Sequence, residues 1–353
     1  MATPGKVART ARAANGSATL TSRDNRWLKE FRLALRGGLP TESGCVGVEG
    51  VRLVEEALRS GCRIEAVLFS ESGERHHERL APLTDRAEMA FPVLRTTDRL
   101  FEGLADTEHP QGVAALVQPR PASFDDLLRT TNDACSPLLV VLAGVQDPGN
   151  VGTILRTAAA FGATGAVTTA SGQSGTASPF SPKALRASAG AALHLPILVG
   201  MSLPILLAQL RVANVRTLAT SVHEKSDATS AAAPGASGAL GAYVGARFSA
   251  SHPAERGSAP VPVGEQHAAP HVGEISTATL APWEVDWCQP VALLVGNEGA
   301  GLPEEIERSA DARIRIPMAS GIESLNAAAA AAVLFYEAAR QRKSLSTAGG
   351  RRA

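Results

Sequence analysis

Two apolar strands that end abruptly in turns constrain the fold of this chain most strongly. The apolar run Val291–Val295 stops at the turn 296–301, which reads GNEGAG, and the short run Arg313–Ile316 meets Pro317 and a polar turn over 318–326. Runs of this kind predict buried strands. Because ligands of open α/β sheets bind beyond the carboxyl ends of the strands, the two turns predict a ligand site.

Composition places the chain among ordinary globular proteins. Its 353 residues are 44 % hydrophobic and 19 % charged, which suffices for one large core or two modest ones. The 34 basic and 34 acidic residues balance, and 4 % aromatic residues leave room only for a small base-stacking surface. The segment 1–36 is different, with eight cations against two carboxylates. Such an arm suits a phosphate backbone, although a solvated tail explains it equally well.

The cysteines argue against a structural metal. Cys45, Cys62, Cys135 and Cys288 lie far apart, in or beside apolar runs, and no CxxC pair occurs. The chain has no signal-peptide-like start and no apolar stretch long enough to span a bilayer. We therefore expect a cytoplasmic protein with reduced thiols, bound to neither metal nor membrane.

Alternating apolar and polar runs predict two α/β domains. We expect a disordered basic tail over 1–22, an α/β sandwich over 23–119, a linker over 120–137 and a second domain over 138–343. In the second domain, strands are expected at 138–142, 165–168, 195–199, 215–220, 291–295 and 313–316. Since helices separate most of these strands, they should pair in parallel with right-handed crossovers.

The segment 226–281 interrupts the second domain. It is rich in Ala, Gly, Ser and Pro, and its only aromatic residues are Tyr243 and Phe248. Such a segment buries too little apolar surface to offset the entropy of ordering. We expect a disordered insertion there, and a disordered tail over 344–353.

The segment 142–163 predicts a strand end, a turn and a helix from Val151. Asn150 is well placed as the N-cap of that helix. Arg156 should project from a face of small residues that includes Gly152, where RNA could approach closely. The simpler alternative is a surface arginine on an amphipathic helix.

Two further segments present polar groups among small residues. Lys183, Arg186 and Ser188 could bind phosphate, or could form an ordinary basic helix end. The turn 296–301 carries Glu298, but it matches neither the dinucleotide fingerprint nor a P-loop, so a purely structural turn is the alternative.

A smooth helix is expected after the second polar turn. Ser324 can cap it, and the six alanines at 327–332 favour the helix with almost no side-chain bulk. Such a helix usually packs closely on a neighbouring backbone or subunit.

Taken in this order, three segments resemble the three motifs of the SpoU/TrmH family of RNA ribose 2′-O-methyltransferases, in the SPOUT superfamily. They are DPGNVGTILRTAAAFGA at 147–163, LLVGNEGAGL at 293–302 and IPMASGIESLNAAAAAA at 316–332. The likeness covers about 138–341 without the insertion. Residues 24–119 resemble the small substrate-binding domain, similar to a ribosomal-protein fold, that precedes the catalytic domain in many members.

The resemblance implies an α/β fold whose C-terminal part forms a deep trefoil knot, and a homodimer through that region. It implies S-adenosyl-L-methionine as methyl donor and structured RNA as substrate. The segment SPKALRASAGA at 181–191 is typical of the branch that acts on ribosomal RNA, which favours ribosomal over transfer RNA.

The resemblance also implies a set of functional residues. The active-site set is Asn150, Arg156, Glu298, Ser324 and Asn326. In this set Arg156 would reach the partner's cofactor, and Glu298 and Asn326 would position Arg156 and the loops. The cofactor contacts, largely through backbone, are Leu294, Val295, Gly296, Asn297, Gly301, Ile316, Met318 and Leu325. The family's counterpart of Arg156 is proposed as a base, but arginine is almost never deprotonated, so binding the adjacent phosphate is the alternative.

Two other functions are weighed against this one. A catalytically silent RNA-binding or ribosome-assembly factor could share the fold, but it would have no chemical need of the five active-site residues. A nucleotide-dependent oxidoreductase is disfavoured by the missing fingerprint.

Overall fold

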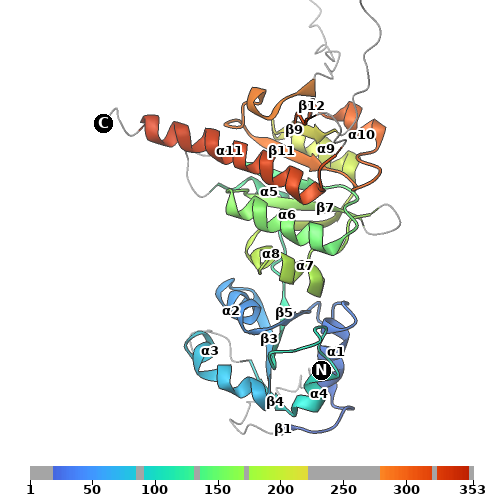
Figure 1. Ribbon diagram of the computed structural model, residues 1–353, viewed down its shortest axis with the longest axis vertical. Coiled ribbons are helices and arrows are strands. Elements are labelled where there is room, and N and C mark those ends of the chain that lie inside the picture. The colour runs from blue at the N-terminus through green and yellow to red at the C-terminus, as the bar shows by residue number, and fades with distance from the viewer. Residues whose placement is uncertain are drawn as a thin grey trace, which may run out of the picture. The chain divides into compact units, whose positions relative to one another are not determined.

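The computed structural model describes most of the chain outside its ends and the insertion. The described residues are 19–84, 91–130, 136–170, 175–221, 279–319 and 324–349, the last six by backbone alone. All of them belong to one compact unit and form two sheets with helices on their faces (Figure 1). Expectations for 1–18, for 222–278 and for Cys135 lie outside the described residues.

The first sheet is mixed and five-stranded, in the order β1-β4-β3-β5-β2. Its strands are β1 (Thr19–Leu20), β2 (Val46–Glu49), β3 (Arg63–Ser70), β4 (Val93–Thr96) and β5 (Val113–Gln118). Helices α1 (Arg26–Leu35) and α4 (Asp98–Glu102) bury their apolar residues on one face, and α2 (Val51–Arg59) and α3 (His77–Thr84) on the other. A short 3-10 turn, Ser72–His76, leads into α3.

The second sheet has seven strands, all parallel, in the order β10-β12-β9-β11-β6-β7-β8. Its strands are β6 (Leu138–Leu142), β7 (Gly165–Thr169), β8 (Ile197–Met201), β9 (Arg216–Thr220), β10 (Thr279–Leu280), β11 (Val291–Val295) and β12 (Ala312–Ile314). The expected parallel pairing is confirmed. Because β6 and β11 are buried on both faces, they consist of Val, Leu and Ala throughout.

Helices cover both faces of the second sheet. Helices α6 (Pro148–Ala160) and α11 (Ala327–Gly349) lie side by side on one face (Figure 1). Helices α5 (Phe124–Leu128), α9 (Leu203–Val212) and α10 (Glu304–Ser309) pack on the other. Two short helices, α7 (Pro182–Ala187) and α8 (Ala191–His194), adjoin α6, and a 3-10 turn, Pro282–Glu284, precedes β11.

The strand order requires a crossing near the site. In the chain β12 follows β11, but in the sheet β9 lies between these two strands and pairs with both. The chain therefore passes across β9 between the two strands. This is the region for which the resemblance implies a trefoil knot, and the threading of the knot stays a prediction.

Helix α6 begins three residues earlier than expected, so the assignment of its cap was wrong. Its N-cap is Asp147, whose carboxylate accepts a hydrogen bond from the backbone N–H of Asn150 at 3.3 Å. Pro148 follows at the first helical position, where its fixed φ favours the helix. Asn150 therefore lies within the first turn, and its side chain is available for another contact.

The cap of α11 also differs from expectation. The helix begins at Ala327, and Asn326 Oδ1 accepts hydrogen bonds from the backbone N–H groups of Ala328 at 2.9 Å and Ala329 at 3.3 Å. Asn326, not Ser324, is thus the capping residue. Farther along, Arg342 donates to loop carbonyl oxygens that include that of Ser136 at 2.6 Å, which holds α11 across the start of β6.

Three predicted boundaries of disorder were wrong by a few residues. Thr19–Leu20 pairs with β4, and Thr279–Leu280 pairs with β12, so each adds a short edge strand. Leu20 and Leu280 pack against buried cores, which stabilises these edges. Helix α11 continues to Gly349, since extending an existing helix adds one hydrogen bond per residue.

The sequence suggested that Gly152 shares the exposed face of Arg156, but it does not. It is buried, and a Cβ there would lie 2.3 Å from the carbonyl oxygen of Ala184. The first turn of α6 therefore lies directly on the backbone of α7. Thr153 and Ala160, which lie three residues before and four residues after Arg156 on α6, are exposed with it.

Candidate active site

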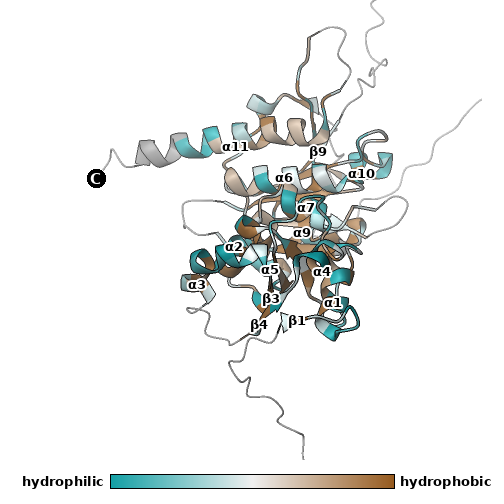
Figure 2. Cartoon of the chain, turned by 60° about the horizontal axis from the view of Figure 1, so that its bottom comes forward, coloured by the Kyte–Doolittle hydropathy of each residue, from teal (hydrophilic) through white to brown (hydrophobic). Residues whose placement is uncertain are grey.

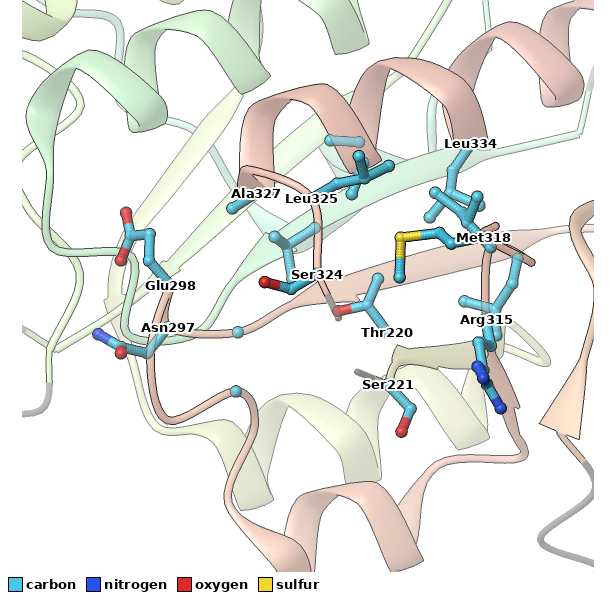
Figure 3. A pocket seen from close by; sticks show the side chains of 17 residues that line it. Thr220, Ser221, Asn297, Glu298, Arg315, Met318, Ser324, Leu325, Ala327 and Leu334 are labelled. Atoms are coloured by element: carbon cyan, nitrogen blue, oxygen red, sulfur yellow. The ribbon is translucent and has the colours of Figure 1, made fainter. Parts of the chain in front are cut away.

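The carboxyl ends of β9, β11 and β12 and the start of α11 enclose one pocket (Figure 3). The space between these elements is about 720 Å³, a figure that includes the part open to solvent. Of the expected cofactor contacts, those that line the pocket are Val295, Gly296, Asn297, Gly301, Ile316, Met318 and Leu325. The loops singled out from the sequence thus meet around one cavity.

Leu294 is the one expected cofactor contact that does not line the pocket. Its side chain is fully buried in the core on the opposite face of the sheet, because alternate residues of a strand point to opposite faces. Its carbonyl oxygen accepts a hydrogen bond from Thr220 Oγ1 at 3.0 Å, and Thr220 itself lines the pocket. Leu294 therefore supports the site from behind.

Several pocket residues were not identified from the sequence. Thr220 is the last residue of β9, Ser221 follows it, and Arg315 follows β12 (Figure 3). One side of α11 adds Ala327, Ala330, Ala331 and Leu334. The helical spacing of these four residues could have identified them, since they fall on one face at i, i+3, i+4 and i+7.

Asn297 fixes the glycine-rich turn from within. Its Oδ1 accepts hydrogen bonds from the backbone N–H groups of Gly299 and Ala300, both at 2.9 Å. Its Nδ2 donates to the carbonyl oxygen of Gly144 at 3.0 Å, which ties the turn to the loop after β6. Two backbone hydrogen bonds with Gly301, at 2.9 and 3.0 Å, close the turn.

Thr176, which the sequence did not single out, secures the same loop from the other side. Its buried hydroxyl accepts from the backbone N–H of Gly144 at 2.9 Å and donates to the carbonyl oxygen of Leu142 at 2.6 Å. Gly144 has a φ of +89°, a conformation that favours glycine. Thr176 thus holds the loop after β6 through the N–H group of Gly144 and the carbonyl oxygen of Leu142.

The closed turn leaves no room for a side chain at Gly296. A Cβ there would lie 2.4 Å from the carbonyl carbon of Gly301 and 2.5 Å from the nitrogen of Leu302. Gly301 has a φ of +68°, in the left-handed region that other residues rarely adopt. Both glycines are therefore required by the geometry of the pocket wall.

A directed chain of hydrogen bonds joins the three motif segments. Asn326 Nδ2 donates to Asn150 Oδ1 at 3.2 Å, and Asn150 Nδ2 donates to Glu298 Oε1 at 3.0 Å. Because Asn326 Oδ1 is occupied in capping α11, only its Nδ2 is left for Asn150. Each amide orientation then fixes the next, from the helix cap to the carboxylate.

Glu298 lies at the acceptor end of this chain. It also accepts from the backbone N–H of Gln146 at 3.4 Å and of Asp147 at 3.5 Å. Burial raises the pKa of Glu298, but hydrogen bonds from Asn150 and from backbone N–H groups outweigh it, so the pKa lies below its ordinary value. The carboxylate is therefore charged at neutral pH. Its stabilising contribution is present above the ordinary pKa and is lost as the pH falls through the lowered one.

Within one chain, Arg156 is apart from the other members of the expected active-site set. Asn150, Glu298 and Asn326 are linked by hydrogen bonds, and Ser324 lines the pocket beside Glu298. Arg156 is exposed on α6, and no hydrogen bond or ion pair joins it to another residue in the part of the chain that the structure describes. Glu298 and Asn326 thus hold Asn150 in place, and the role that the resemblance implies for them in positioning Arg156 stays a prediction.

The three residues expected to bind RNA phosphate have different surroundings. Lys183 Nζ lies 2.6 Å from Asp147 Oδ1, and this hydrogen bond is the main cause that lowers the pKa of Asp147. Arg186 pairs with Asp106 at 2.7 Å. Ser188 was an incorrect choice, because its side chain is fully buried at the end of α7.

Neither a metal cluster nor a membrane span is found in the described ranges. No group of three or more His, Cys, Asp or Glu side chains among these residues could hold a metal ion. No helix among them is long and apolar enough to cross a bilayer. Cys45 and Cys62 are free and buried, whereas Cys288 is half-buried.

We predict that the polarity of the hydrogen-bond chain can be reversed. In Asn326→Asp the carboxylate still caps α11 but cannot donate to Asn150, which should lower the free energy of unfolding by about 1–3 kcal/mol. Adding Glu298→Gln supplies a donor at the far end, so a turned Asn150 amide regains both partners. Chemical denaturation of the two single variants and the double variant should therefore show a favourable coupling of about 1 kcal/mol.

Gln341→Glu is the matched control. Gln341 Nε2 donates to Glu337 in the second half of α11, so the substitution also turns a donor into an acceptor. It is too far from Glu298 to couple, and its effect should add to that of Glu298→Gln. Additive effects for Asn326→Asp as well would refute the directed chain.

Comparison with known proteins covers both sheets. The SpoU rRNA Methylase family matches residues 137–241 and 266–336, and the family described as RNA 2'-O ribose methyltransferase substrate binding matches 48–122. An uncharacterized tRNA/rRNA methyltransferase of Synechocystis sp. is 30 % identical over 334 residues, which cover 94 % of this chain and 97 % of the relative.

Two characterised or solved relatives are similar over nearly their whole length. The 23S rRNA (uridine(2479)-2'-O)-methyltransferase of Streptomyces viridochromogenes is 29 % identical, with 93 % of this chain and 94 % of the relative covered. The crystal structure of an AdoMet-bound rRNA methyltransferase from Sinorhizobium meliloti matches with a TM-score of 0.64 at 26 % identity, covering 92 % of this chain and 98 % of that one. With these matches spanning both sheets and the pocket, the chain belongs to the SpoU family of RNA 2′-O-ribose methyltransferases.

Proposed function

We propose that this protein transfers the methyl group of S-adenosylmethionine to a ribose 2′-hydroxyl of ribosomal RNA. The observation that carries the proposal is the directed chain from Asn326 through Asn150 to Glu298 at the rim of the pocket. The name of the Streptomyces viridochromogenes relative supports the choice of RNA, since it describes 2′-O-methylation of 23S rRNA. A cytoplasmic location, expected from the sequence, suits that substrate.

The pocket fits the chemistry of the methyl donor. Ile316, Met318 and Leu334 give it apolar walls suited to an adenine ring, and the turn at Gly296 brings polar backbone groups to its edge (Figure 3). A relative of similar structure is described as AdoMet-bound. When bound, S-adenosylmethionine supplies an activated methyl group on a sulfonium, so the protein need not activate the donor.

The chain's own residues then have to orient the nucleophile. In the proposed transfer the 2′-oxygen would bond to the methyl carbon, the electrons of the breaking carbon–sulfur bond would go to sulfur, and the hydroxyl proton would pass to water. Orientation in line with the breaking bond provides much of the rate enhancement in such transfers. We assign Ser324 to contact the reacting groups at the pocket, and the Asn150–Glu298 pair to hold the rim in place.

We assign Arg156 to the RNA phosphate next to the reacting ribose. Its guanidinium is exposed and is not engaged by another described residue, so it is free to form the bidentate contact that arginine makes with phosphate. Because a guanidinium stays protonated, this role is chemically easier than that of a base.

We further propose that the protein is a homodimer through α6 and α11. Tyr336 and Val333 on α11 are 58 % and 43 % exposed, although both are large and apolar. The Tyr336 ring packs edge-on against Phe161, the C-cap residue of α6, with ring centroids 6.0 Å apart. A partner bound to this surface would cover these side chains. It would also bring its own Arg156 toward the Asn150 side of the pocket, where one chain alone has no arginine.

The proposed reaction is tested with purified protein, methyl-labelled S-adenosylmethionine and ribosomal RNA. We predict that label appears in a single 2′-O-methylnucleoside after complete digestion of the RNA. Arg156→Lys should reduce turnover at least tenfold, because an ammonium cannot make the bidentate contact. Label on a base would contradict the assigned chemistry, and no transfer to any RNA would favour the silent binding factor.

The dimer is tested by mixing two inactive variants. Arg156→Ala removes the contact to phosphate, and Met318→Trp fills the pocket with an indole. If each site combines Arg156 of one subunit with the pocket of the other, co-refolded mixtures should recover about a quarter of wild-type activity, since half the dimers are mixed and each has one intact site. Separately refolded variants give the background. A mixture no more active than that background would refute a shared site.

A further inference from the structure

Helix α1 lies outside both regions that match the family. The matched regions begin at residue 48, whereas α1 spans Arg26–Leu35. It is nevertheless firmly built: Asn25 caps its first turn, accepting from Trp27 N at 2.9 Å. Its buried residues, which pack on the first sheet, are Leu28, Phe31, Ala34 and Leu35. The opposite side of the helix is therefore held in a fixed place on the surface.

That opposite side is basic. The described residues from Thr19 to Arg36 include two carboxylates, those of Asp24 and Glu30, against five cations. The cations are Arg23, Arg26, Lys29, Arg32 and Arg36. Figure 2 shows hydrophilic residues, in teal, along α1. This excess of positive charge is concentrated on one short, rigid helix and the residues beside it, in a chain whose charges balance overall.

The charges are available to a ligand. Arg26 pairs with Glu30 at 2.8 Å and Lys29 with Asp24 at 3.3 Å, but the side chains of Arg26 and Lys29 are 83 % and 57 % exposed. Exposed pairs of this kind contribute little to stability, so they exchange readily for a stronger anion. Arg23 and Arg32 have no acidic partner in the part of the chain that is described.

The end of α1 leads toward the active site. A Cβ on Gly38, two residues beyond Arg36, would lie 3.5 Å from Cδ of Pro182, the first residue of α7. The next residue, Lys183, pairs with Asp147, whose backbone N–H donates to Glu298. The segment that follows α1 therefore lies beside the start of α7, and Lys183 of α7 contacts the loop that reaches Glu298.

We propose that the basic face of α1, Arg23 to Arg36, binds the sugar-phosphate backbone of the RNA substrate at a distance from the modified nucleotide. The inference rests on the proposed RNA methylation. The ligand is RNA and not a membrane or an acidic protein, because the face adjoins the site where RNA reacts. Contacts of this kind set the register of the substrate without reading its bases.

The test compares two triple variants with the wild-type protein. Arg23→Gln, Arg32→Gln and Arg36→Gln together remove three charges from the basic face of α1, and glutamine keeps the helix propensity. The control removes three exposed, acid-paired arginines elsewhere: Arg59→Gln, Arg129→Gln and Arg308→Gln. Binding of fluorescently labelled 23S ribosomal RNA, transcribed in vitro, is measured at several salt concentrations, and binding of S-adenosylmethionine is measured by calorimetry.

We expect the α1 variant to bind RNA at least tenfold more weakly at low salt. The slope of log K against log salt should fall by about two, since each phosphate contact contributes roughly 0.7–0.9. The control should stay within twofold of wild type, and both should bind S-adenosylmethionine normally. Wild-type affinity and slope in the α1 variant would overturn the proposal, as would an equal loss in the control.

Two further outcomes have separate meanings. If the wild-type protein binds and methylates the RNA while the α1 variant matches it, the inference about α1 fails and the proposed function stands. If the wild-type protein neither binds nor methylates RNA, the proposed function itself fails. Binding of wild-type protein to phosphatidylserine vesicles, abolished in the α1 variant with RNA binding intact, would overturn the assignment of RNA as ligand.

Discussion

Asn326 caps α11 through its side-chain oxygen, and this single contact orients the rest of the active site. With the oxygen engaged, only the Nδ2 group remains to donate to Asn150, and Asn150 in turn has only its own Nδ2 for Glu298. Three loops from distant parts of the chain are thereby fixed by complementary donors and acceptors. A parallel sheet brings the loops to one edge, and the amide chain holds them in one arrangement.

The pocket wall is rigid, whereas the arginine of the expected active-site set is exposed to solvent. Gly296, Asn297 and Gly301 close the turn that walls the pocket, whereas Arg156 is exposed on α6 and has no hydrogen-bond or ion-pair partner among the described residues. An arginine so placed can serve a site that a second subunit completes. The apolar side chains of Val333 and Tyr336, exposed nearby on α11, give such a subunit something to bury.

The continuous apolar runs predicted β6 and β11 correctly, because strands buried on both faces carry no polar residue. The capping residues were harder to predict: Asp147 and Asn150 could each cap α6, and only the contact with Glu298 shows why Asn150 does not. The side chain of Leu294 faces away from the pocket, and the sequence did not show this because the side of a strand that faces a pocket depends on the neighbouring helices. Hydrogen bonds between side chains 148 and 176 residues apart leave no local pattern in a sequence.

Binding of S-adenosylmethionine to Gly296→Ala, measured by calorimetry beside the wild-type protein, tests most directly whether the closed turn forms the cofactor site. A Cβ at this position would lie 2.4 Å from the backbone of Gly301, so the turn could not close. Affinity should fall at least a hundredfold while the circular dichroism spectrum stays native. Gly299→Ala, whose Cβ would approach nothing closer than 3.7 Å, should bind like wild type. Wild-type affinity in Gly296→Ala would contradict the account.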